Sequence, residues 1–173
     1  NSMIDAMAVV GEKFKNGEIF VPEMIVAARA MKKGVEVLKP HLASGATGSM
    51  GKLIIATVAG DLHDIGKNLV AMMIESAGFE VIDLGVDVPV SKVIECYKEN
   101  PDVKVIALSA LLTTTMPSLK DTVAALNAED FRGNVKIMVG GAPITKGFAD
   151  EIGADGYSED AASAAVLAKA LVA

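Results

Sequence analysis

From residue 53 onward, short apolar runs alternate with segments whose apolar residues recur every three or four positions. The apolar runs lie at 53–58, 79–84, 103–108, 135–139 and 156–157, and the segments with helical spacing lie at 67–77, 91–99, 117–127, 145–152 and 161–172. Strands that alternate with helices in this way form a parallel sheet with right-handed crossovers. The alternation therefore predicts an α/β fold, a flavodoxin-like (Rossmann-like) five-stranded parallel sheet with helices on both faces.

The composition agrees with such a sheet and excludes several other classes of protein. Hydrophobic residues make up 51% of the chain, yet no apolar run approaches the roughly 20 residues that cross a bilayer. The formal net charge of -6 argues against nucleic acid or an anionic membrane surface as a partner. Cys96 is the single cysteine, which excludes an internal disulfide and a cysteine-rich metal site, and we expect the protein in the cytoplasm.

The N-terminal part of the chain has a different pattern, that of two amphipathic helices. Helical spacing predicts one helix over residues 3–16 and a second one from Pro22 up to Pro40. A hairpin of two helices cannot bury both of its apolar faces alone, so either further helices upstream complete a bundle or the pair lies on another surface of the protein. The expected parts are a helical cap at 1–41 whose natural N-terminus lies upstream, a flexible linker rich in Ala, Ser, Gly and Thr at 42–51, and the main domain at 52–173.

The polar loop after the first apolar run carries the residues best suited to bind a ligand. In an open α/β sheet such a loop lies at the carboxyl edge, where ligands bind. His63 stands between Asp61 and Asp64, and a neutral imidazole can bind a metal with one nitrogen while a carboxylate holds its other N–H. Asp61 is our candidate for that carboxylate. Gly66 lets the backbone approach a large planar ligand, or take a turn that a Cβ would forbid.

The same loop also permits a purely structural interpretation. Asp64 or Asp61 would then cap the following helix, and His63 would be a solvated loop residue. Lys67 lies at the start of that helix, where it either meets a phosphate group or, as we expect, is solvated. His41 has no acidic or cysteine neighbour in the sequence, and we interpret it as structural or solvated.

Two further segments end strands at the same predicted edge of the sheet. The stretch from Ser109 to Thr115 has an unusual density of hydroxyl groups. These hydroxyls can bond a polar ligand, extend the hydrogen bonds of the histidine loop, or cap the helix that begins at Pro117. The Gly140-Gly141 pair removes two side chains where a bulky group would enter between loop and sheet, although turns also use such pairs. The sequence contains neither the phosphate-loop motif nor the glycine-rich dinucleotide motif.

The combination of these motifs is more specific than any one of them. The order Asp61-x-His63-x-x-Gly66, Ser109-x-Leu111, Gly140-Gly141 resembles the cobalamin-binding domain in which a protein histidine replaces the dimethylbenzimidazole of the cofactor as lower ligand to cobalt. The resemblance covers nearly the whole chain. Residues 11–14, 20–23 and 30–40 look like the helical cap of its methyl-transferring branch. That branch contains the cobalamin module of methionine synthase and the small corrinoid proteins of methanol, methylamine, glycine betaine and methoxyaromatic methyltransferases.

The resemblance implies a role for each matching residue. His63 would be the lower cobalt ligand, Asp61 would accept its other N–H, and Thr115 would be the third member of a proton relay, where methionine synthase has serine. Phe14 and Val21 would shield the upper face of the corrin. The other cofactor-binding residues implied are Gly60, Leu62, Asp64, Ile65 and Gly66 in the first loop, Ser109, Leu111 and Thr113 beside the displaced benzimidazole, Gly140 and Gly141 in the third segment, and Tyr157 and Ala161 in a stretch that closes over the nucleotide end.

The function implied by the resemblance is that of a methyl carrier. The cofactor would be cobalamin or a related corrinoid, in its methyl form during turnover. A methyltransferase for the donor, a second methyltransferase for the acceptor and a reductive activase would be the partners, and the truncated cap could pair with a second copy to give a homodimer. The alternatives are the small subunit of an adenosylcobalamin-dependent mutase, which lacks the helical cap, a cobalamin-sensing module, which needs an output domain, and an interaction domain without cofactor.

Overall fold

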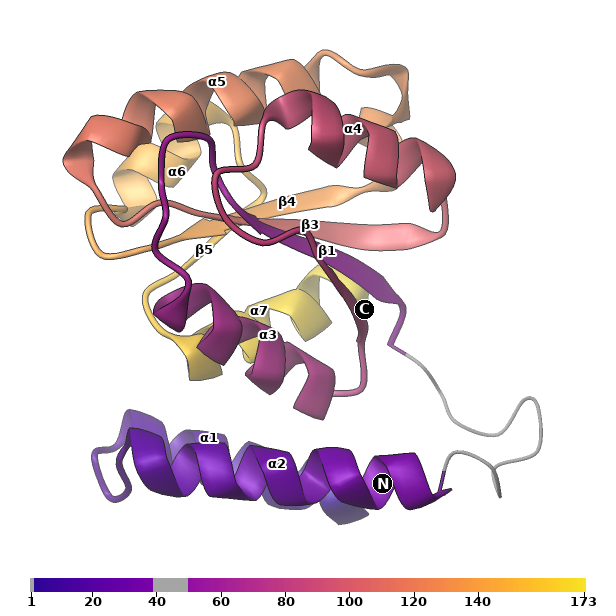
Figure 1. Cartoon of the computed structure of the whole chain (residues 1–173), viewed down its shortest axis with the longest axis vertical. Helices are drawn as coiled ribbons and strands as arrows, with labels where there is room; N and C mark the ends of the chain where they lie inside the picture. The colour runs from indigo at the N-terminus through magenta and orange to yellow at the C-terminus, as the bar shows by residue number, and fades with distance from the viewer. Residues whose placement is uncertain (1, 39–49) are drawn as a thin grey trace.

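Five parallel strands form the sheet that the alternating runs predicted (Figure 1). The computed structural model of the protein describes residues 2–38 and 50–173. The strands are β1 Lys52–Thr57, β2 Glu80–Asp83, β3 Val103–Ser109, β4 Lys136–Gly140 and β5 Gly156–Ser158. They pair in the flavodoxin-like order β2-β1-β3-β4-β5. Because the order reverses between β1 and β3, a ligand is expected in the crevice between the loops that follow these two strands.

Helices cover both faces of the sheet (Figure 1). One face carries α3 Ile65–Ser76 and α7 Ala161–Val172, and the other carries α4 Val90–Glu99, α5 Met116–Asn127 and α6 Lys146–Ile152. Two short 3₁₀ helices, η2 Thr113–Thr115 and η3 Asp130–Asn134, flank α5. Side chains alternate along a strand, so Ile54 packs in the core with α4 and α5 while its neighbours Leu53 and Ile55 pack in the core with α3 and α7. This double burial explains the continuous apolar runs.

The carboxyl ends of four neighbouring strands place one residue each side by side. Thr57 pairs with Ser109, Ser109 pairs with Gly140, and Gly140 pairs with Ser158. The apolar runs predict Ser109 and Gly140 just beyond their strands, because apolar character marks the buried part of a strand and not its last hydrogen-bonded residue. The register therefore fixes this row of small residues at the edge where the ligand is expected.

The helices α1 Ser2–Lys15 and α2 Val21–Leu38 form a hairpin on the outer surface of α3 and α7 (Figure 1). Met7 of α1 and Met24 and Ala28 of α2 are buried in the same apolar core as α3 and α7. Gly11 permits a close approach, since a Cβ at this position would lie 3.2 Å from the end of the Met73 side chain. Of the two arrangements that the sequence left open, the hairpin takes the second and lies on another surface of the protein.

The boundaries between the expected parts fall largely outside the described residues. Of the linker expected at 42–51, the structure describes Met50 and Gly51, and His41 also lies outside the described part. The helix α2 ends at Leu38 and β1 begins at Lys52, which is compatible with the expected division. Within the described ranges, no helix combines the length and the apolar character needed to cross a membrane.

Replacing Gly141 by alanine tests whether the edge of the sheet depends on close backbone packing. Gly141 has a φ of +128°, and a Cβ there would lie 1.9 Å from the carbonyl oxygen of Ala110. We expect Gly141→Ala to lower the free energy of unfolding by at least about 2 kcal/mol in urea titrations of the ligand-free protein. Gly147→Ala is the control, because nothing lies near its Cβ position in α6 and alanine there should raise stability by up to about 1 kcal/mol. Equal effects of the two substitutions would mean that the fold does not depend on the close packing at Gly141.

Candidate functional site

A cavity of about 510 Å³ opens at the carboxyl edge of the sheet, in the crevice predicted by the strand order. Its walls are mostly apolar. It is lined by residues 62–67, 69–70, 107–111, 138–142 and 158–161, together with Phe14 of α1 and Ile55 of β1. The first turns of α3 and α7, the ends of β3 and β4 and the helical hairpin thus meet around one space. Segments far apart in the sequence can therefore hold one ligand.

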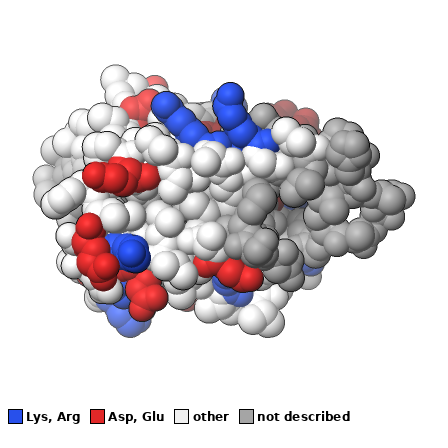
Figure 2. Space-filling view, turned by 90° about the horizontal axis from the view of Figure 1, so that it is seen from below, with Lys and Arg blue, Asp and Glu red and all other residues white. Residues whose placement is uncertain are grey.

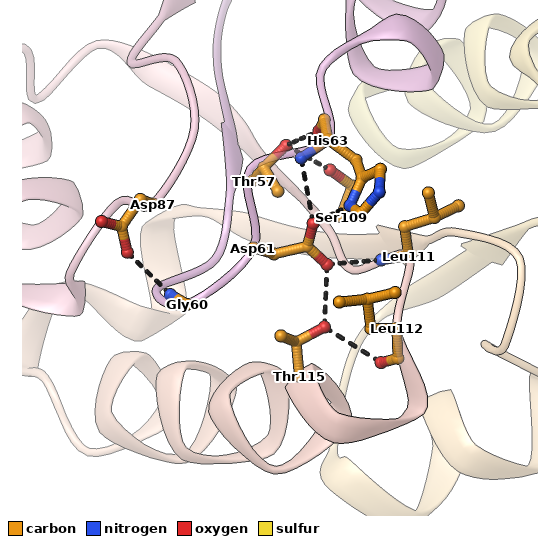
Figure 3. Close-up of polar contacts among 9 residues, drawn as sticks. All are labelled: Thr57, Gly60, Asp61, His63, Asp87, Ser109, Leu111, Leu112 and Thr115. Carbon is orange, nitrogen blue, oxygen red and sulfur yellow. Dashed lines mark hydrogen bonds and ion pairs between the residues drawn. The ribbon is translucent and has the colours of Figure 1, made fainter.

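Three side chains form a chain of hydrogen bonds that ends at this cavity (Figure 3). Nδ1 of His63 lies 2.8 Å from Oδ1 of Asp61, and the hydroxyl of Thr115 donates to Oδ2 of the same carboxylate over 2.8 Å. The amide of Leu111 also donates to Oδ2, over 2.7 Å, and the amide of His63 donates to Oδ1, over 3.1 Å. One carboxylate therefore joins the loop after β1, the loop after β3 and the helix η2.

Asp61 is fully buried, and its charge follows from its partners. Burial opposes ionisation, but the hydrogen bonds that Leu111, Thr115 and His63 donate outweigh burial and hold the pKa of the Asp61 carboxyl well below its usual range. Asp61 is therefore a carboxylate at neutral pH, and it is engaged in this network and not in capping α3. Asp64, at the N-cap of α3, makes no side-chain capping bond either. The helix-capping interpretation of the loop is therefore wrong.

The hydroxyl-rich stretch after β3 also does not cap the next helix. Thr115 occupies the N-cap position of α5, but its side chain makes no capping hydrogen bond. Its hydroxyl lies within donating distance of the Asp61 carboxylate and, at 2.9 Å, of the Leu112 carbonyl oxygen. Of the uses that the sequence left open, Thr115 extends the hydrogen bonds of the histidine loop.

The Asp61 carboxylate holds one ring nitrogen of His63, and His63 also lines the cavity. A carboxylate can only accept, so Nδ1 carries the proton of the neutral ring and Nε2 keeps a lone pair. The His63 side chain is 50% exposed, so the ring can meet a ligand. Among the described residues, no group of three or more His, Cys, Asp or Glu side chains is placed to hold a metal ion. One histidine suffices for a metal that brings its other ligands with it, as a metal held in a macrocycle does.

Two residues that the sequence motifs did not single out support this loop (Figure 3). The Thr57 hydroxyl donates to the carbonyl oxygen of His63 over 3.0 Å and lies 2.9 Å from the Ser109 hydroxyl. Asp87 has a positive φ of 52°, and its Oδ1 accepts from the Gly60 amide over 2.7 Å. Thr57 is the one hydroxyl residue in the first apolar run, which is a signal in the sequence. The positive φ of Asp87 has no such signal.

The sequence predicts Lys67 to be solvated, and this prediction is wrong. The Lys67 side chain is 2% exposed, and its ammonium group pairs with Asp83 at the end of β2 and donates to the side chain of Asn68. The ion pair ties the first turn of α3 to β2 and so holds the far end of the His63 loop. Sequence reasoning missed it because the partner carboxylate lies on the next strand and not in the same helix.

The cavity brings together most of the residues that the resemblance implied. Those that line it are Phe14, Leu62, His63, Asp64, Ile65, Gly66, Ser109, Leu111, Gly140, Gly141 and Ala161. Asp61 and Thr115 lie behind His63 and are bonded to each other as described above. The roles of these residues toward a cofactor stay predictions.

Besides Asp61 and Thr115, four of the implied residues do not line the cavity, although the structure describes all of them. Gly60 forms a turn with a φ of +82°, and Thr113 is exposed in η2. Val21 is exposed at the start of α2. Tyr157 packs against the core on the side of α4, α5 and α6, and its neighbour Ser158 lines the cavity instead, because successive residues of a strand point to opposite faces.

Different features of the structure explain why glycine stands at three positions of the cavity wall. At Gly140 a Cβ would lie 2.9 Å from the carbonyl oxygen of Ser158, and at Gly141 it would overlap the backbone of Ala110. Contact between neighbouring segments therefore requires both of these glycines. Gly66 lies in the first turn of α3 without a positive φ, and nothing lies near its Cβ position. Gly66 is therefore not explained by a turn that a Cβ would forbid. The other explanation, that its missing side chain lets a ligand approach the backbone, agrees with the open space beside it.

Comparisons with known proteins agree with this geometry. Two family models, both described as B12 binding domain, match residues 51–166 and 1–39. The chain is 49% identical to dimethylamine corrinoid protein 1 of Methanosarcina acetivorans, over 96% of this chain and 78% of that protein. It is similar to the solved structure of a cobalamin-binding protein of Desulfitobacterium hafniense, with 38% identity, a TM-score of 0.84, and 98% of this chain and 80% of that chain covered. It is also similar to a chain of the methanol:cobalamin methyltransferase complex of Methanosarcina barkeri, with 32% identity, a TM-score of 0.81, and 98% and 64% of the two chains covered.

The acid stability of the ligand-free protein tests the charge of Asp61. The pKa of Asp61 is lower in the folded chain than in the unfolded chain, where it is about 3.9. Ionised Asp61 therefore stabilises the fold above that pH, and this contribution is lost as the pH falls from about 4 through the folded pKa. At pH 7, Asp61→Asn should lower the free energy of unfolding by about 1–3 kcal/mol, because an amide cannot accept from all the donors. The difference from the wild type should shrink below pH 4 or so.

Asp64→Asn is the matched control for this measurement. Asp64 lies in the same loop, is exposed, and accepts from the side chain of Asn68 over 3.2 Å. Its replacement should change the free energy of unfolding by less than about 0.5 kcal/mol at either pH. If the free energy of unfolding depends on pH in the same way in both variants, ionisation of Asp61 is not what stabilises the fold above about pH 4.

Proposed function

This chain belongs to the B12-binding domain family, and from that premise we propose that it is a corrinoid protein that carries a methyl group between methyltransferases. Membership of the family confirms the resemblance, the fold class and the cobalamin-type cofactor that the sequence predicted. The observation that carries the proposal is the half-exposed ring of His63, held by the buried Asp61 at the edge of an apolar cavity.

The residues around the cavity fit a corrinoid. A corrin is a large planar ring that brings its own nitrogen ligands to cobalt, so one imidazole is enough from the protein. Leu62 and Ile65 expose apolar side chains on either side of His63, and Gly66 leaves open space beside them. The apolar cavity behind this rim lies between the ends of the strands, where it would take the displaced nucleotide tail.

The task of the protein's own residues is to control His63. When bound, the cofactor supplies a cobalt atom that accepts a methyl group and gives it up again. Asp61 keeps the proton on Nδ1 of His63 and so leaves Nε2 unprotonated for the metal. The Asp61 carboxylate, 2.8 Å from Nδ1, would also balance a positive charge on the ring if Nε2 carried a proton in place of a metal. The donors from Leu111 and Thr115 hold Asp61 ionised, so the proton between the two side chains stays on Nδ1 of His63.

We infer that the methyl donor is a methylamine. The chain shares 49% identity with a protein named as a dimethylamine corrinoid protein and 47% with one named as a trimethylamine corrinoid protein, but 32% with the chain of the methanol complex. The proposed partners are a methyltransferase for this donor, a second methyltransferase for the acceptor, and a reductive activase. The family model that matches residues 1–39 favours this function over a mutase subunit, which has no helical cap.

The hairpin has an outward side that the described part of the chain leaves uncovered. Val9 of α1 and Val26 of α2 are exposed, while the opposite sides of both helices pack on α3 and α7. Figure 2 views the molecule from this side, where uncharged atoms cover much of the middle. We propose that this surface pairs with the same surface of a second copy to give a homodimer. We also propose that residues 1–41 form a cap domain and that residues 52–173 form the cobalamin-binding domain.

Labelling histidine with nitrogen-15 tests whether His63 binds cobalt. The cobalt(II) form of the loaded protein should show the hyperfine pattern of one histidine nitrogen, and labelling should change this pattern. His63→Gly should remove the pattern and weaken cofactor binding by at least about tenfold. His41→Gly, which replaces the one other histidine of the chain, should keep the hyperfine pattern and the affinity for the cofactor. A pattern that does not respond to labelling would exclude His63 as the ligand.

Methylation of the bound cofactor tests the carrier function. With a methylamine donor alone, the reduced loaded protein should stay unmethylated, and addition of the cognate methyltransferase should methylate it rapidly, as seen in the visible spectrum. Monomethylamine, dimethylamine, trimethylamine and methanol, each with its own methyltransferase, identify the donor. Rapid and saturable methylation without a partner would mean that the chain is a complete enzyme and not a carrier.

Sedimentation equilibrium at several concentrations tests the homodimer. The wild type should dissociate on dilution, and Val26→Glu should be monomeric at concentrations where the wild type is dimeric, because a charge in an apolar interface is costly. Val166→Glu is the control, since Val166 is as exposed as Val26 but lies on α7. A wild type that is monomeric at every concentration would contradict the proposal.

A further inference from the structure

Thr57 lies where two walls of the site meet. It is the last residue of β1, it stands beside Ser109 of β3, and it is 1% exposed. His63 and Ser109 both line the cavity, whereas Thr57 does not. Contact with a ligand therefore does not explain a hydroxyl at this position. A valine would fill the same space in a strand that is otherwise apolar, so the hydroxyl group must be explained by what it bonds.

The directions of its two hydrogen bonds follow from the chemistry of the groups (Figure 3). A carbonyl oxygen can only accept, so the single proton of the Thr57 hydroxyl goes to the carbonyl of His63, 3.0 Å away. The oxygen of Thr57 then accepts from the Ser109 hydroxyl, 2.9 Å away. Neither bond depends on a ligand. If a ligand in the cavity draws the proton of Ser109 to itself, Thr57 can still donate to His63.

We propose that Thr57 is a positioning residue that holds His63 from its backbone side. Asp61 already holds the His63 amide and Nδ1, and Thr57 adds the carbonyl group. Both backbone polar groups of a residue in an exposed loop are thus fixed by buried side chains. The ring can turn away from a metal about its side-chain bonds while the loop stays in place, and it then returns to the same position. Support of this kind keeps a ligand within the narrow geometry that metal binding needs.

The test compares Thr57→Val, which keeps the shape and removes the hydroxyl, with Thr57→Ser, which keeps the hydroxyl. Each protein is loaded with cobinamide, a corrinoid without the nucleotide tail, so that contacts of a tail with Ser109 do not enter the result. The fraction of cobalt(II) with a histidine nitrogen is then read from the hyperfine pattern. Thr57→Val should lower the ratio of bound to free His63 by about threefold to tenfold, and Thr57→Ser should stay within about twofold of the wild type.

A second readout uses the ligand-free protein. Hydrogen exchange of the His63 amide, which donates to Asp61, should become about threefold to tenfold faster in Thr57→Val. Amides in the centre of β3 should keep their wild-type rates. A uniform acceleration in both places would mean that the substitution only lowers overall stability, and this would overturn the inference.

The inference rests on the proposed role of His63 at cobalt, and the experiment separates the two. A wild type that shows no histidine nitrogen on cobalt would overturn the proposed function and this inference with it. A wild type that shows the nitrogen, together with Thr57→Val at the same ratio, would overturn the inference alone. The same holds if Thr57→Ser behaves like Thr57→Val, because the hydroxyl would then not be the group that matters.

Discussion

The arrangement of the site depends on one buried carboxylate. Moving the charge of Asp61 out of water would cost several kcal/mol if nothing compensated it. Here the amide and ring of His63, the amide of Leu111 and the hydroxyl of Thr115 all donate to it. None of these segments can shift without leaving a buried polar group unsatisfied. His63 is thus the exposed end of a network whose other members are fixed, which explains how a loop residue can hold a ring in one orientation.

The parallel sheet supplies the frame for this network. Its register places Thr57, Ser109, Gly140 and Ser158 in one row, so that small side chains leave a cavity where the loops diverge. The ion pair between the buried Lys67 and the exposed Asp83 fixes α3 beyond the histidine loop, and the helical hairpin brings Phe14 to the same cavity. Methyl transfer between partner proteins needs a metal that is both held firmly and accessible. A half-exposed histidine whose amide, carbonyl and Nδ1 are held by buried side chains, and whose Nε2 is left for the metal, meets both needs.

The sequence was sufficient for the fold and for the centre of the site, but not for their supports. Alternating apolar runs predict the sheet because buried strands must be apolar on both faces, and Asp61, His63 and Thr115 are polar residues in the segments that follow two of these strands. Lys67 was misjudged because burial of a charge depends on a partner from another strand. The sequence leaves two explanations for the Gly140-Gly141 pair, room for a bulky group and a turn, whereas the backbone of Ala110 and Ser158 requires both glycines. The resemblance implies a role for Tyr157 at the cofactor, but alternation along β5 turns Ser158 and not Tyr157 to the cavity.

Nitrogen-15 NMR of the His63 ring measures most directly whether Asp61 sets its tautomer. In the ligand-free protein, at a pH where the ring is neutral, Nδ1 should carry the proton and Nε2 should have the chemical shift of an unprotonated nitrogen. The chain has two histidines, so a His41→Asn variant assigns the signals. A ring protonated at Nε2, or an even mixture of the two tautomers, would contradict the proposed control of His63. The unprotonated nitrogen would then face the carboxylate and would not be available to cobalt.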